Sequence, residues 1–490
     1  MKKINLLLII IFCVVSKLFS QYSDRTWVIG NQTFIYMALK FDSLGLDSIF
    51  TPPHMYFLAT SASISDSSGN LLFYTNGEYI ENGNFQRLQN STNFNPSTIN
   101  DSVYGLNIDG GVVVIPYPNH PDLFYVFHVN YEEFVKNNHT FDNPLELRYS
   151  IVDMNLDNGL GGIDPANKTI PVINDTLVLG RLGACRHGNG RDWWLITHRF
   201  ENNTFHKLLI TPDTILTSTQ NIGNIVSQYT PTGFSSFNPQ GTKLAVLEWD
   251  TLVNLYNFDR CNGTLSNYYP LFIHDSLSYA YGMAFSPSGR FLYVSTFYSV
   301  YQYDLTAANI YNSRITVAKL DSVTYNGGRL YFSYMKLAPD GKIYINTWDG
   351  TQYIHVINNP EGMGVACNFV QHAIRLSAWS ASVFPNAPNY SLGNLPGSIC
   401  DSLINSTAEV QVPENPRIYP NPSHGRFTIE INERIQKGRM EIYNQLGNLI
   451  FTAILQNKKT EIDLSAFPAG LYSFRLIGEK QMGVGKIVLE

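Results

Sequence analysis

The chain has 490 residues, a formal net charge of −6 and only 15% charged residues, and it is rich in tyrosine and phenylalanine. A mildly acidic chain without a basic run argues against nucleic acid as a partner. Abundant aromatic side chains and few charges favour many short, half-buried β-strands.

The first twenty residues have the layout of a secretory signal peptide: two lysines, an apolar run and a short polar exit. Cleavage is predicted between Ser20 and Gln21, because Ser20 is small enough for the cleavage site. Cys13 suggests a lipoprotein signal, but Phe12 before it is too bulky for that cleavage. No segment reaches about 18 consecutive apolar residues, so we expect a mature chain without a transmembrane segment.

Along residues 21–390 one local pattern recurs: a polar turn closing on Gly or Asp, then a strongly apolar strand. Its copies are SDSSGNLLFY (65–74), PNHPDLFYVF (118–127), HGNGRDWWLIT (187–197), FNPQGTKLAV (237–246), FSPSGRFLYV (285–294) and LAPDGKIYIN (337–346). Proline at the second turn position and glycine at positive φ account for the turn sequence. A repeat of about 40–50 residues with four short strands is typical of a β-propeller blade.

We therefore predict an all-β chain in which residues 21–390 form a seven-bladed β-propeller, with six or eight blades as alternatives. The seventh blade would be shared by residues 25–39 and 374–384. Joining the two ends in one blade would hide edge strands that otherwise invite aggregation. A pair of β-sandwiches is the alternative fold, but it fits the near-regular spacing of the turns poorly.

The body also resembles a largely uncharacterised family of exported propeller proteins from Bacteroidota, over about residues 25–403. The resemblance is carried by SASISDSSGNLLFYTNG, YSIVDMNLDNGLGG, RHGNGRDWWLITH, YNFDRCNGTLSN, FSPSGRFLYVS, LAPDGKIYI and the closing FPNAPNYSLGNLPGSICDSL. It implies a fold and an exported setting, and it implies no activity.

The stretch CRHGNGRDWW, at 185–194, carries the most reactive side chains of the repeats. His187, Arg191 and Asp192 are candidates for an acid–base or anion-binding group in a cleft. The same stretch occupies the turn position of the other copies, so a role in holding the turn is the favoured interpretation.

Asp153, Asp157 and Asp164 lie among glycines, which suggests a Ca²⁺ loop. They lack the alternating ligand spacing and the terminal Glu of an EF-hand, so a glycine-rich turn is favoured. No cofactor is predicted.

Four cysteines follow the signal peptide: Cys185, Cys261, Cys367 and Cys400. Export permits disulfides, and four cysteines allow three pairings that the sequence does not rank.

The tripeptide Asp, Ser or Thr, then an aliphatic residue occurs nine times, where composition alone would give on the order of one or two. It resembles the O-glycosylation site of exported Bacteroidota proteins. The implied acceptors are Ser43, Ser48, Ser102, Thr176, Thr214, Thr251, Ser276, Ser322 and Ser402. The alternative is that these pairs simply start turns, and both can hold because an acceptor lies in an exposed loop.

Residues 391–416 contain Pro, Gly and Ser without periodicity and are predicted to be a linker. Short alternating strands follow, which indicates a small antiparallel β-sandwich at 417–490. This segment resembles the type A C-terminal sorting domain of the type IX secretion system, and an accessory sandwich that binds sugar or protein is the alternative. Its motif residues are Pro420, Asn421, Pro422, Gly425, Phe427, Gly470 and Tyr472, with IYNQLGNLI and the terminal KIVLE.

The resemblance of the tail implies the type IX secretion machinery as a partner, and a secreted or cell-surface protein that passes through the periplasm. It also implies removal of the tail, with the body released or attached to a surface glycolipid. We expect a binding protein whose propeller presents loops to a glycan or protein ligand. The alternative is a polysaccharide hydrolase or lyase with its site in the propeller channel.

Overall fold

The computed structural model is built almost entirely of β-strands and divides into two compact units, Met1–Asp401 and Ser402–Glu490. The described residues are 23–30, 36–42, 45–50, 55–96, 105–136, 139–226, 233–248, 252–273, 279–348, 351–377, 384–401, 417–430, 438–444, 449–455, 457–478 and 482–490. The predicted signal cleavage site, Ser20 and Gln21, lies outside them.

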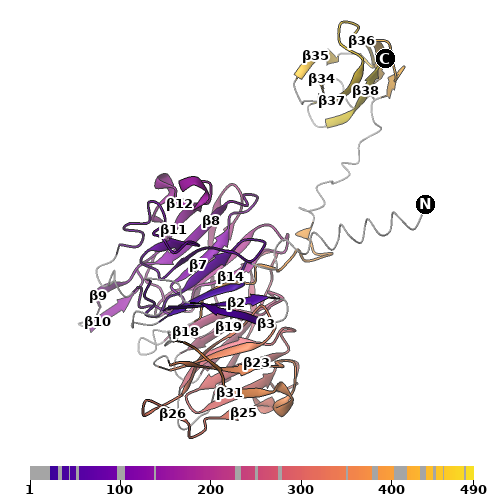
Figure 1. The fold of residues 1–490 in the computed structure, drawn as a ribbon. Helices are drawn as coiled ribbons and strands as arrows, with labels where there is room; N and C mark the ends of the chain where they lie inside the picture. Colours follow the sequence, from indigo (N-terminus) through magenta and orange to yellow (C-terminus); the bar gives the residue numbers. More distant parts are fainter. Residues whose placement is uncertain are drawn as a thin grey trace. The chain divides into compact units, whose positions relative to one another are not determined.

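In its described residues the first unit contains seven sheets of three or more antiparallel strands, numbered here in chain order (Figure 1). Sheet 1 has β1 (Thr26–Gly30), β2 (Tyr36–Asp42) and β3 (Gly45–Phe50), and sheet 2 has β4 (Ala62–Ser65), β5 (Leu71–Thr75) and β6 (Ile80–Asn82). Sheet 3 has β7 (Val112–Pro116), β8 (Leu123–Val129), β11 (Glu146–Asp153), β12 (Gly162–Ile163) and β13 (Ile170–Asn174).

The next four sheets each have four strands, paired in chain order. Sheet 4 has β14 (Gly183–Arg186), β15 (Trp193–His198), β16 (Thr204–Ile210) and β17 (Ile215–Asn221). Sheet 5 has β18 (Gly233–Phe237), β19 (Lys243–Glu248), β20 (Leu252–Phe258) and β21 (Leu265–Phe272). Sheet 6 has β22 (Ala280–Phe285), β23 (Phe291–Thr296), β24 (Ser299–Asp304) and β25 (Ile315–Lys319). Sheet 7 has β28 (Phe332–Leu337), β29 (Ile343–Thr347), β30 (Tyr353–Ile357) and β31 (Phe369–Arg375).

Short elements lie between these strands. Two hairpins are formed by β9 (Glu132–Lys136) with β10 (His139–Asn143) and by β26 (Thr324–Tyr325) with β27 (Gly328–Arg329). The 3₁₀ turns are η1 (Asp157–Gly159), η2 (Pro165–Asn167), η3 (Tyr311–Ser313) and η4 (Gly364–Cys367).

The recurring sequence pattern is the first hairpin of sheets 2 to 7. Its polar turns join the first strand of a sheet to the second, at 66–70, 117–122, 187–192, 238–242, 286–290 and 338–342. In sheet 6 the turn residue Gly289 has φ of 72°, and its N–H donates to the carbonyl of Ser286 at 2.8 Å. Glycine adopts this backbone conformation without strain, which explains why the turns close on it.

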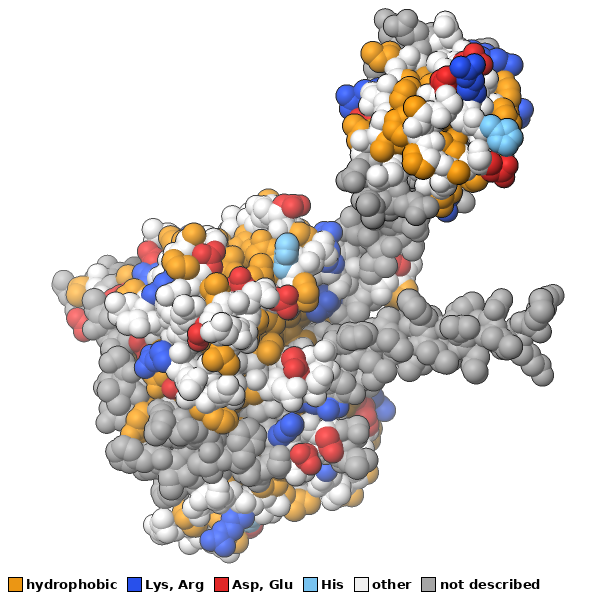
Figure 2. Space-filling model, turned by 45° about the horizontal axis from the view of Figure 1, so that its top comes forward, with side chains coloured by type: hydrophobic (Ala, Val, Ile, Leu, Met, Phe, Trp, Pro, Cys, Tyr) orange, Lys and Arg blue, Asp and Glu red, His pale blue; other side chains and the backbone are white. Residues whose placement is uncertain are grey.

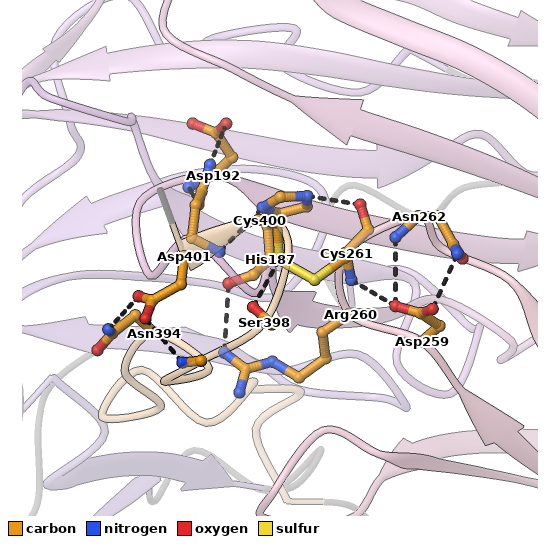
Figure 3. Close-up of a disulfide and its surroundings, with 12 residues drawn as sticks. His187, Asp192, Asp259, Arg260, Cys261, Asn262, Asn394, Ser398, Cys400 and Asp401 are labelled. Atoms are coloured by element: carbon orange, nitrogen blue, oxygen red, sulfur yellow. Dashed lines mark hydrogen bonds between the residues drawn. A yellow bond between two sulfur atoms is a disulfide. The ribbon is translucent and has the colours of Figure 1, made fainter. Parts of the chain in front are cut away.

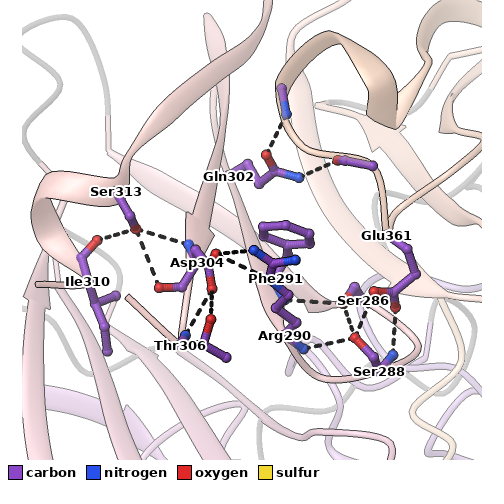
Figure 4. A network of polar contacts seen from close by, with 12 residues as sticks. Ser286, Ser288, Arg290, Phe291, Gln302, Asp304, Thr306, Ile310, Ser313 and Glu361 are labelled. Carbon is purple, nitrogen blue, oxygen red and sulfur yellow. Dashed lines mark hydrogen bonds and ion pairs between the residues drawn. The ribbon is translucent and has the colours of Figure 1, made fainter. Parts of the chain in front are cut away.

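Polar contacts join sheets 6 and 7 beside one of these turns (Figure 4). The carboxylate of Glu361 accepts hydrogen bonds from the N–H and the hydroxyl of Ser288, both at 2.6 Å. The Gln302 side chain donates to the carbonyl of Gly362 at 2.7 Å and accepts from the N–H of Gly364 at 2.8 Å. The loop after β30 is therefore fixed to its neighbouring sheet.

The first strands of the sheets contact one another in order, from β1 through β4, β7, β14, β18 and β22 to β28. Sheet 7 then packs against sheet 1, where Trp27 and Phe41 form one buried cluster with Tyr344. Antiparallel sheets that stack around a ring with their first strands innermost form a β-propeller. The all-β propeller predicted from the sequence is confirmed.

The closing blade predicted from residues 25–39 and 374–384 is described only in part. β1 and β2 pair with each other, and β31 pairs with β30 in sheet 7. Residues 378–383 lie outside the described residues. On either side of them, Leu376 and Phe384 join the cluster around Trp27. The ends of the ring thus meet through packed side chains, and the blade number stays a prediction.

The body extends beyond the boundary predicted from the sequence. Leu392 packs against a core cluster that includes Cys185 and Trp194, and Cys400 forms a disulfide with Cys261. The linker predicted to begin at residue 391 is therefore placed too early. A composition of Pro, Gly and Ser does not distinguish a solvated linker from a segment whose backbone is bound by distant turns.

The surface of the first unit carries charges of both signs. On the face seen in Figure 2, Asp and Glu side chains are interspersed with Lys and Arg. Interspersed charges do not add up to a long-range field of one sign. Among the described residues, no helix is long and apolar enough to cross a membrane.

The second unit is an antiparallel β-sandwich, as predicted. One sheet has β32 (Arg417–Tyr419), β33 (Arg426–Glu430) and β36 (Lys459–Asp463), and the other has β35 (Leu449–Leu455), β34 (Gly438–Tyr443), β37 (Gly470–Gly478) and β38 (Met482–Leu489). Phe427 and Ile429 from the first sheet pack against Met440, Phe474 and Ile487 from the second in a single core.

The motif residues of this unit have local structural roles. The amide side chain of Asn421 donates to the carbonyl of Lys486 at 2.9 Å and accepts from the N–H of Val488 at 2.8 Å, which ties the YPNP stretch to β38. A Cβ on Gly425 would lie 2.5 Å from the Cα of Ser465, so only glycine fits there. Phe427 is buried, whereas Pro420 and Pro422 are exposed. Gly470 begins β37, and the hydroxyl of Tyr472 donates to the carbonyl of Pro468 at 2.7 Å.

Candidate functional site: a cavity in the propeller channel

A cavity of about 500 Å³ lies in the channel of the first unit. Its wall comes from the first strands of sheets 4 to 7, from the turns of sheets 5 to 7, from Asp24, Arg25 and Asp42 near the start of the ring, and from residues 384–389, 391 and 392. A volume of this size lies within the range of small-ligand sites.

Two acidic and two basic residues line this cavity, Asp24, Asp42, Arg25 and Lys336, and the pKa values of Asp24 and Lys336 are shifted. Lys336 lies on β28, and Asp24 lies just before β1; both keep some exposed surface because they face the cavity. Burial raises the pKa of Asp24 from 3.8 to about 6, although the charge of Lys336 lowers it. Burial lowers the pKa of Lys336 from 10.5 to about 8, although the charge of Asp24 raises it. The cavity therefore holds an acceptor and a donor whose charges are both incompletely solvated.

The remaining wall mixes amides and aromatic rings. The polar lining residues include Asn238, Ser235 and Asn389, and the aromatic ones include Phe234 and Phe237. The hydroxyl of Ser235 is buried and has no hydrogen-bond partner among the described residues. Ligand sites commonly combine apolar walls with a few such placed polar groups.

A side-chain bond crosses the channel at the end where the first strands begin. The hydroxyl of Tyr334, on β28, donates to the carboxylate of Asp109, which lies just before β7. Sheets 7 and 3 are not neighbours in the ring, so this bond spans the channel. The ring of Phe234 lies 4.7 Å from that of Tyr334 and fills the space beside it. Burial raises the pKa of Asp109 to about 6, although its bond to Tyr334 lowers it.

Residues 384–401, here called the exit segment, run from the strand-start end of the channel, where Asn386 lies, to the turn end. The amide of Asn386 donates to the carbonyls of Gly110 at 3.1 Å, Val112 at 3.1 Å and Leu182 at 3.0 Å, and so joins sheets 3 and 4. The carbonyl of Ala387 accepts from the ammonium of Lys336 at 3.0 Å. An ammonium has three N–H donors, so donors remain for a ligand.

The exit segment continues over the turns of sheets 4 and 5. The amide of Asn389 donates to the carbonyl of Pro239 at 2.8 Å, and the N–H of Leu395 donates to the carbonyl of Gly188 at 2.7 Å. A Cβ on Gly190 would lie 2.7 Å from the backbone nitrogen of Asn394. The glycine of this turn is thus required both by its φ of 72° and by the chain that passes over it.

A disulfide and an arginine hold the far end of the exit segment (Figure 3). Cys400 is bonded to Cys261, with their Cα atoms 5.5 Å apart and 139 residues between them in sequence. The buried guanidinium of Arg260 donates to the carbonyl of Arg186 at 2.9 Å, to that of His187 at 3.2 Å and to that of Gly393. Each of the three pairings that the sequence allows has two disulfides, and the described residues contain one, Cys261–Cys400. Cys185 and Cys367 are buried thiols.

His187, Arg191 and Asp192 lie together in the turn of sheet 4, outside the residues that line the cavity. The His187 Nε2 contacts the carbonyl of Cys261 at 2.8 Å, and its Nδ1 accepts from the N–H of Asn189 at 3.1 Å. Asp192 accepts from the Asn189 amide at 2.8 Å and from Arg191 at 2.6 and 2.9 Å. Both ring nitrogens of His187 are thus engaged in holding the turn next to the disulfide.

The candidate calcium ligands bond to their own turns. Asp153 accepts from the N–H of Asn155 at 2.8 Å, and Asp164 accepts from the N–H of Ala166 at 3.0 Å. Asp157 begins η1. In the part of the chain that the structure describes, no group of three or more His, Cys, Asp or Glu residues is placed to hold a metal ion.

The glycosylation candidates fall into two sets. Thr214 and Ser322 are exposed in loops, Thr176 is half-buried, and Ser48 lies in β3. The remaining five lie outside the described residues: Ser43, Ser102, Thr251, Ser276 and Ser402.

Asp24, Asp109, Tyr334 and Lys336 are not among the site residues predicted from the sequence. One signal was available for Lys336. When the recurring turns are aligned, it stands where the copies of sheets 5 and 6 have small residues, Ser236 and Ala284. A lysine at an otherwise small or apolar position of an inner strand indicates a charge that faces the channel.

Comparison with known proteins separates the tail from the body. Residues 417–490 match the model of the secretion system C-terminal sorting domain family. No curated protein matches the chain in sequence.

Solved structures with a similar arrangement share little sequence with this chain. A functionally unknown protein from Desulfotomaculum acetoxidans is 15% identical over 74% of this chain and 99% of its own, with a TM-score of 0.39. The Swd1 β-propeller domain from Myceliophteria thermophila is 10% identical over 67% of this chain and 94% of its own, with a TM-score of 0.34. The periplasmic gluconolactonase PpgL from Pseudomonas aeruginosa is 11% identical over 95% of this chain and 99% of its own, with a TM-score of 0.34. The match at 417–490 supports export of the chain by the type IX secretion system, to the cell surface or the medium.

Proposed function

We propose that the first unit is a secreted binding protein that holds a sugar of a glycan in its channel cavity. The observation that carries this proposal is the cavity of about 500 Å³ with Asp24 and Lys336 in its wall. A cavity of this volume suits one or two sugar rings and is too small for a protein loop of any length.

The chemistry of the wall suits a neutral, hydroxyl-rich ligand. A carboxylate accepts hydrogen bonds from hydroxyl groups, and an ammonium donates to them, so one diol can satisfy both Asp24 and Lys336 without adding charge. The rings of Phe234 and Phe237 offer flat apolar faces to the C–H face of a sugar. The wall carries two acidic and two basic residues, so a charged ligand would upset the balance of charge in the cavity.

A sugar-cleaving enzyme is the second candidate. Asp24 and Lys336 share one cavity, and their pKa values of about 6 and about 8 lie near those useful for an acid and a base at neutral pH. His187 and Arg191, which would have joined such a group, lie elsewhere. Binding without turnover is therefore the favoured function.

A single screen tests both functions. The full chain is titrated calorimetrically with neutral gluco-, manno-, galacto- and xylo-oligosaccharides, and the same mixtures are analysed for shortened products. We expect binding without products, lost at least tenfold in Lys336→Met and in Asp24→Asn. Lys342→Met is the matched control, because Lys342 lies in the turn after β28 and does not line the cavity. Product formation that Asp24→Asn abolishes would establish the enzyme instead.

For the tail we propose removal after export, with the body released or attached to a surface glycolipid, and glycosylation of exposed sites such as Thr214 and Ser322. Deleting residues 417–490 should leave a folded first unit in the periplasm, since that unit has its own cores and disulfide. Appearance of the truncated chain at the surface would contradict the export role. An intact mass equal to that of the bare chain would contradict glycosylation.

A further inference from the structure

We propose that the cavity recognises the terminal sugar of a glycan chain and excludes sugars in the interior of the chain. The inference rests on the proposed function and adds the class of ligand. Its basis is that the channel is obstructed at its strand-start end and covered over part of its turn end, so a polymer cannot thread through it.

The strand-start end is obstructed by the bond between Tyr334 and Asp109. Both side chains are set among protein atoms, and burial is the largest cause of the raised pKa of each. The bond joins sheets on different sides of the ring, and the Phe234 ring packs beside it at 4.7 Å. A sugar chain would have to break this bond and displace an aromatic ring to leave by this end.

The exit segment adds to the obstruction of the strand-start end through Asn386, and it then covers the turn end over sheets 4 and 5. The N–H of Asn386 donates to the carbonyl of Ser61 in front of β4 at 2.8 Å, which adds sheet 2 to the sheets already joined. The hydroxyl of Tyr390 donates to the carbonyl of Val114 in sheet 3 at 2.9 Å, and its backbone carbonyl accepts from Arg186 of sheet 4 at 3.2 Å. Tyr390 itself is buried.

The exit segment is held along its length and at its end, so it does not behave as a hinged lid. The Cys261–Cys400 disulfide fixes the end, and the guanidinium of Arg260 donates to the carbonyl of Gly393. Leu392 lines the cavity and packs in the cluster that contains the Cys185 thiol. Several anchors in series must open together before this wall moves.

The sector left for access lies over sheets 6 and 7 and sheet 1. The lining residues at that side include Pro287, Pro339 and Gly341 from the turns, with Asp42 from β2. A ligand that enters there meets Lys336 and Asp24 and then the obstructed strand-start end. One sugar terminus can enter, and the rest of the glycan must leave by the same sector.

The test uses the full chain and the sugar series that binds in the screen described above. Oligosaccharides of one to six units are compared with the same oligosaccharides methylated on all hydroxyls of the terminal sugars. We expect the affinity for an oligosaccharide to stop rising beyond two sugar units, with one protein bound per oligosaccharide end. The methylated forms should bind at least tenfold more weakly. Affinity that grows with every unit, several proteins per chain, or equal binding of blocked forms would overturn terminal recognition. If none of the sugars binds, the proposed function fails and takes this inference with it.

The variant Cys261→Ser/Cys400→Ser tests the role of the wall. We expect blocked oligosaccharides to bind at least fivefold better than they bind the native chain, because a released exit segment widens the opening. Cys185 reports the release directly: its labelling by a maleimide should become at least tenfold faster, while Cys367, which is buried in a cluster between sheets 6 and 7, should not change. Unchanged labelling of Cys185 together with unchanged selectivity would overturn the proposal. Leu392→Ala, which keeps the disulfide, supplies the same readouts if the double variant does not fold.

Discussion

The two ends of the propeller channel are obstructed by different means. At the strand-start end, one hydrogen bond joins Tyr334 to Asp109 across the ring. At the turn end, the exit segment crosses the turns of sheets 4 and 5 and is fixed by the Cys261–Cys400 disulfide. The first obstruction depends on the protonation and pairing of two side chains, whereas the second depends on covalent connectivity. The two ends should therefore respond to different perturbations.

The largest expected effect comes from the covalent end. Changing Cys261 and Cys400 to serine should lower the free energy of unfolding of the first unit by about 3–5 kcal/mol, because the disulfide closes a long loop in the unfolded chain. Urea denaturation followed by tryptophan fluorescence measures this. Cys367→Ala is the control, since Cys367 is buried but takes no part in the disulfide. A loss no larger than that of the control would show that the exit segment is held without the disulfide.

The second effect concerns the charge between the two ends. Burial raises the pKa of Asp24 from 3.8 to about 6, so the folded state binds this proton more tightly than the unfolded state does. The stabilisation is complete below pH 4 and is lost as the pH rises through about 6. Asp24→Asn removes this dependence and should gain up to about 3 kcal/mol at pH 7, less the attraction to Lys336 that is lost. Unfolding curves between pH 4 and 8 measure the difference.

Asp122→Asn is the matched control for that series, because Asp122 is exposed in the turn of sheet 3. Its stability should follow the native pH profile. If Asp24→Asn also followed the native profile, Asp24 would be solvated in the folded protein, and the cavity would lack the charge on which the proposed function depends.

The third effect concerns the hydrogen-bonded end. Tyr334→Phe keeps the ring beside Phe234 and removes the hydroxyl, which leaves the Asp109 carboxyl without this donor. We expect a loss of about 1–3 kcal/mol, the cost of an unpaired buried polar group, and a further rise in the pKa of Asp109. Tyr353→Phe, on the third strand of sheet 7 and outside the channel, should cost less. Equal costs for both variants would mean that the Tyr334 bond contributes nothing to closing the channel.

The two ends also differ in how far the sequence predicts them. The six turns were visible because their proline and glycine chemistry is local. The exit segment was mistaken for a linker, because its partners lie far away in sequence: Asn386 reaches Leu182, and Cys400 reaches Cys261. No local pattern encodes such contacts.

The candidate site shows the same division. His187 and its neighbours stood out because reactive residue types are adjacent in the sequence, and adjacency in a turn is enough for them to bond to one another. Asp24 and Lys336 are more than three hundred residues apart and meet only because the ring brings sheets 1 and 7 together. Only Lys336, a lysine at an otherwise small or apolar position of an inner strand, could be predicted from the sequence. Its partner Asp24 could not.

The smallest expected effect comes from a joint at the rim, where sheets 6 and 7 meet outside the channel. Glu361 accepts two hydrogen bonds from Ser288, but both residues are exposed. Because water competes for exposed charged groups, Glu361→Gln should cost less than about 1 kcal/mol and should leave ligand affinity unchanged. If Glu361→Gln lowered the free energy of unfolding as much as Tyr334→Phe, contacts at the rim would stabilise the ring as strongly as contacts across its channel. Closure of the ring at its rim, rather than obstruction of the channel, would then control access to the site.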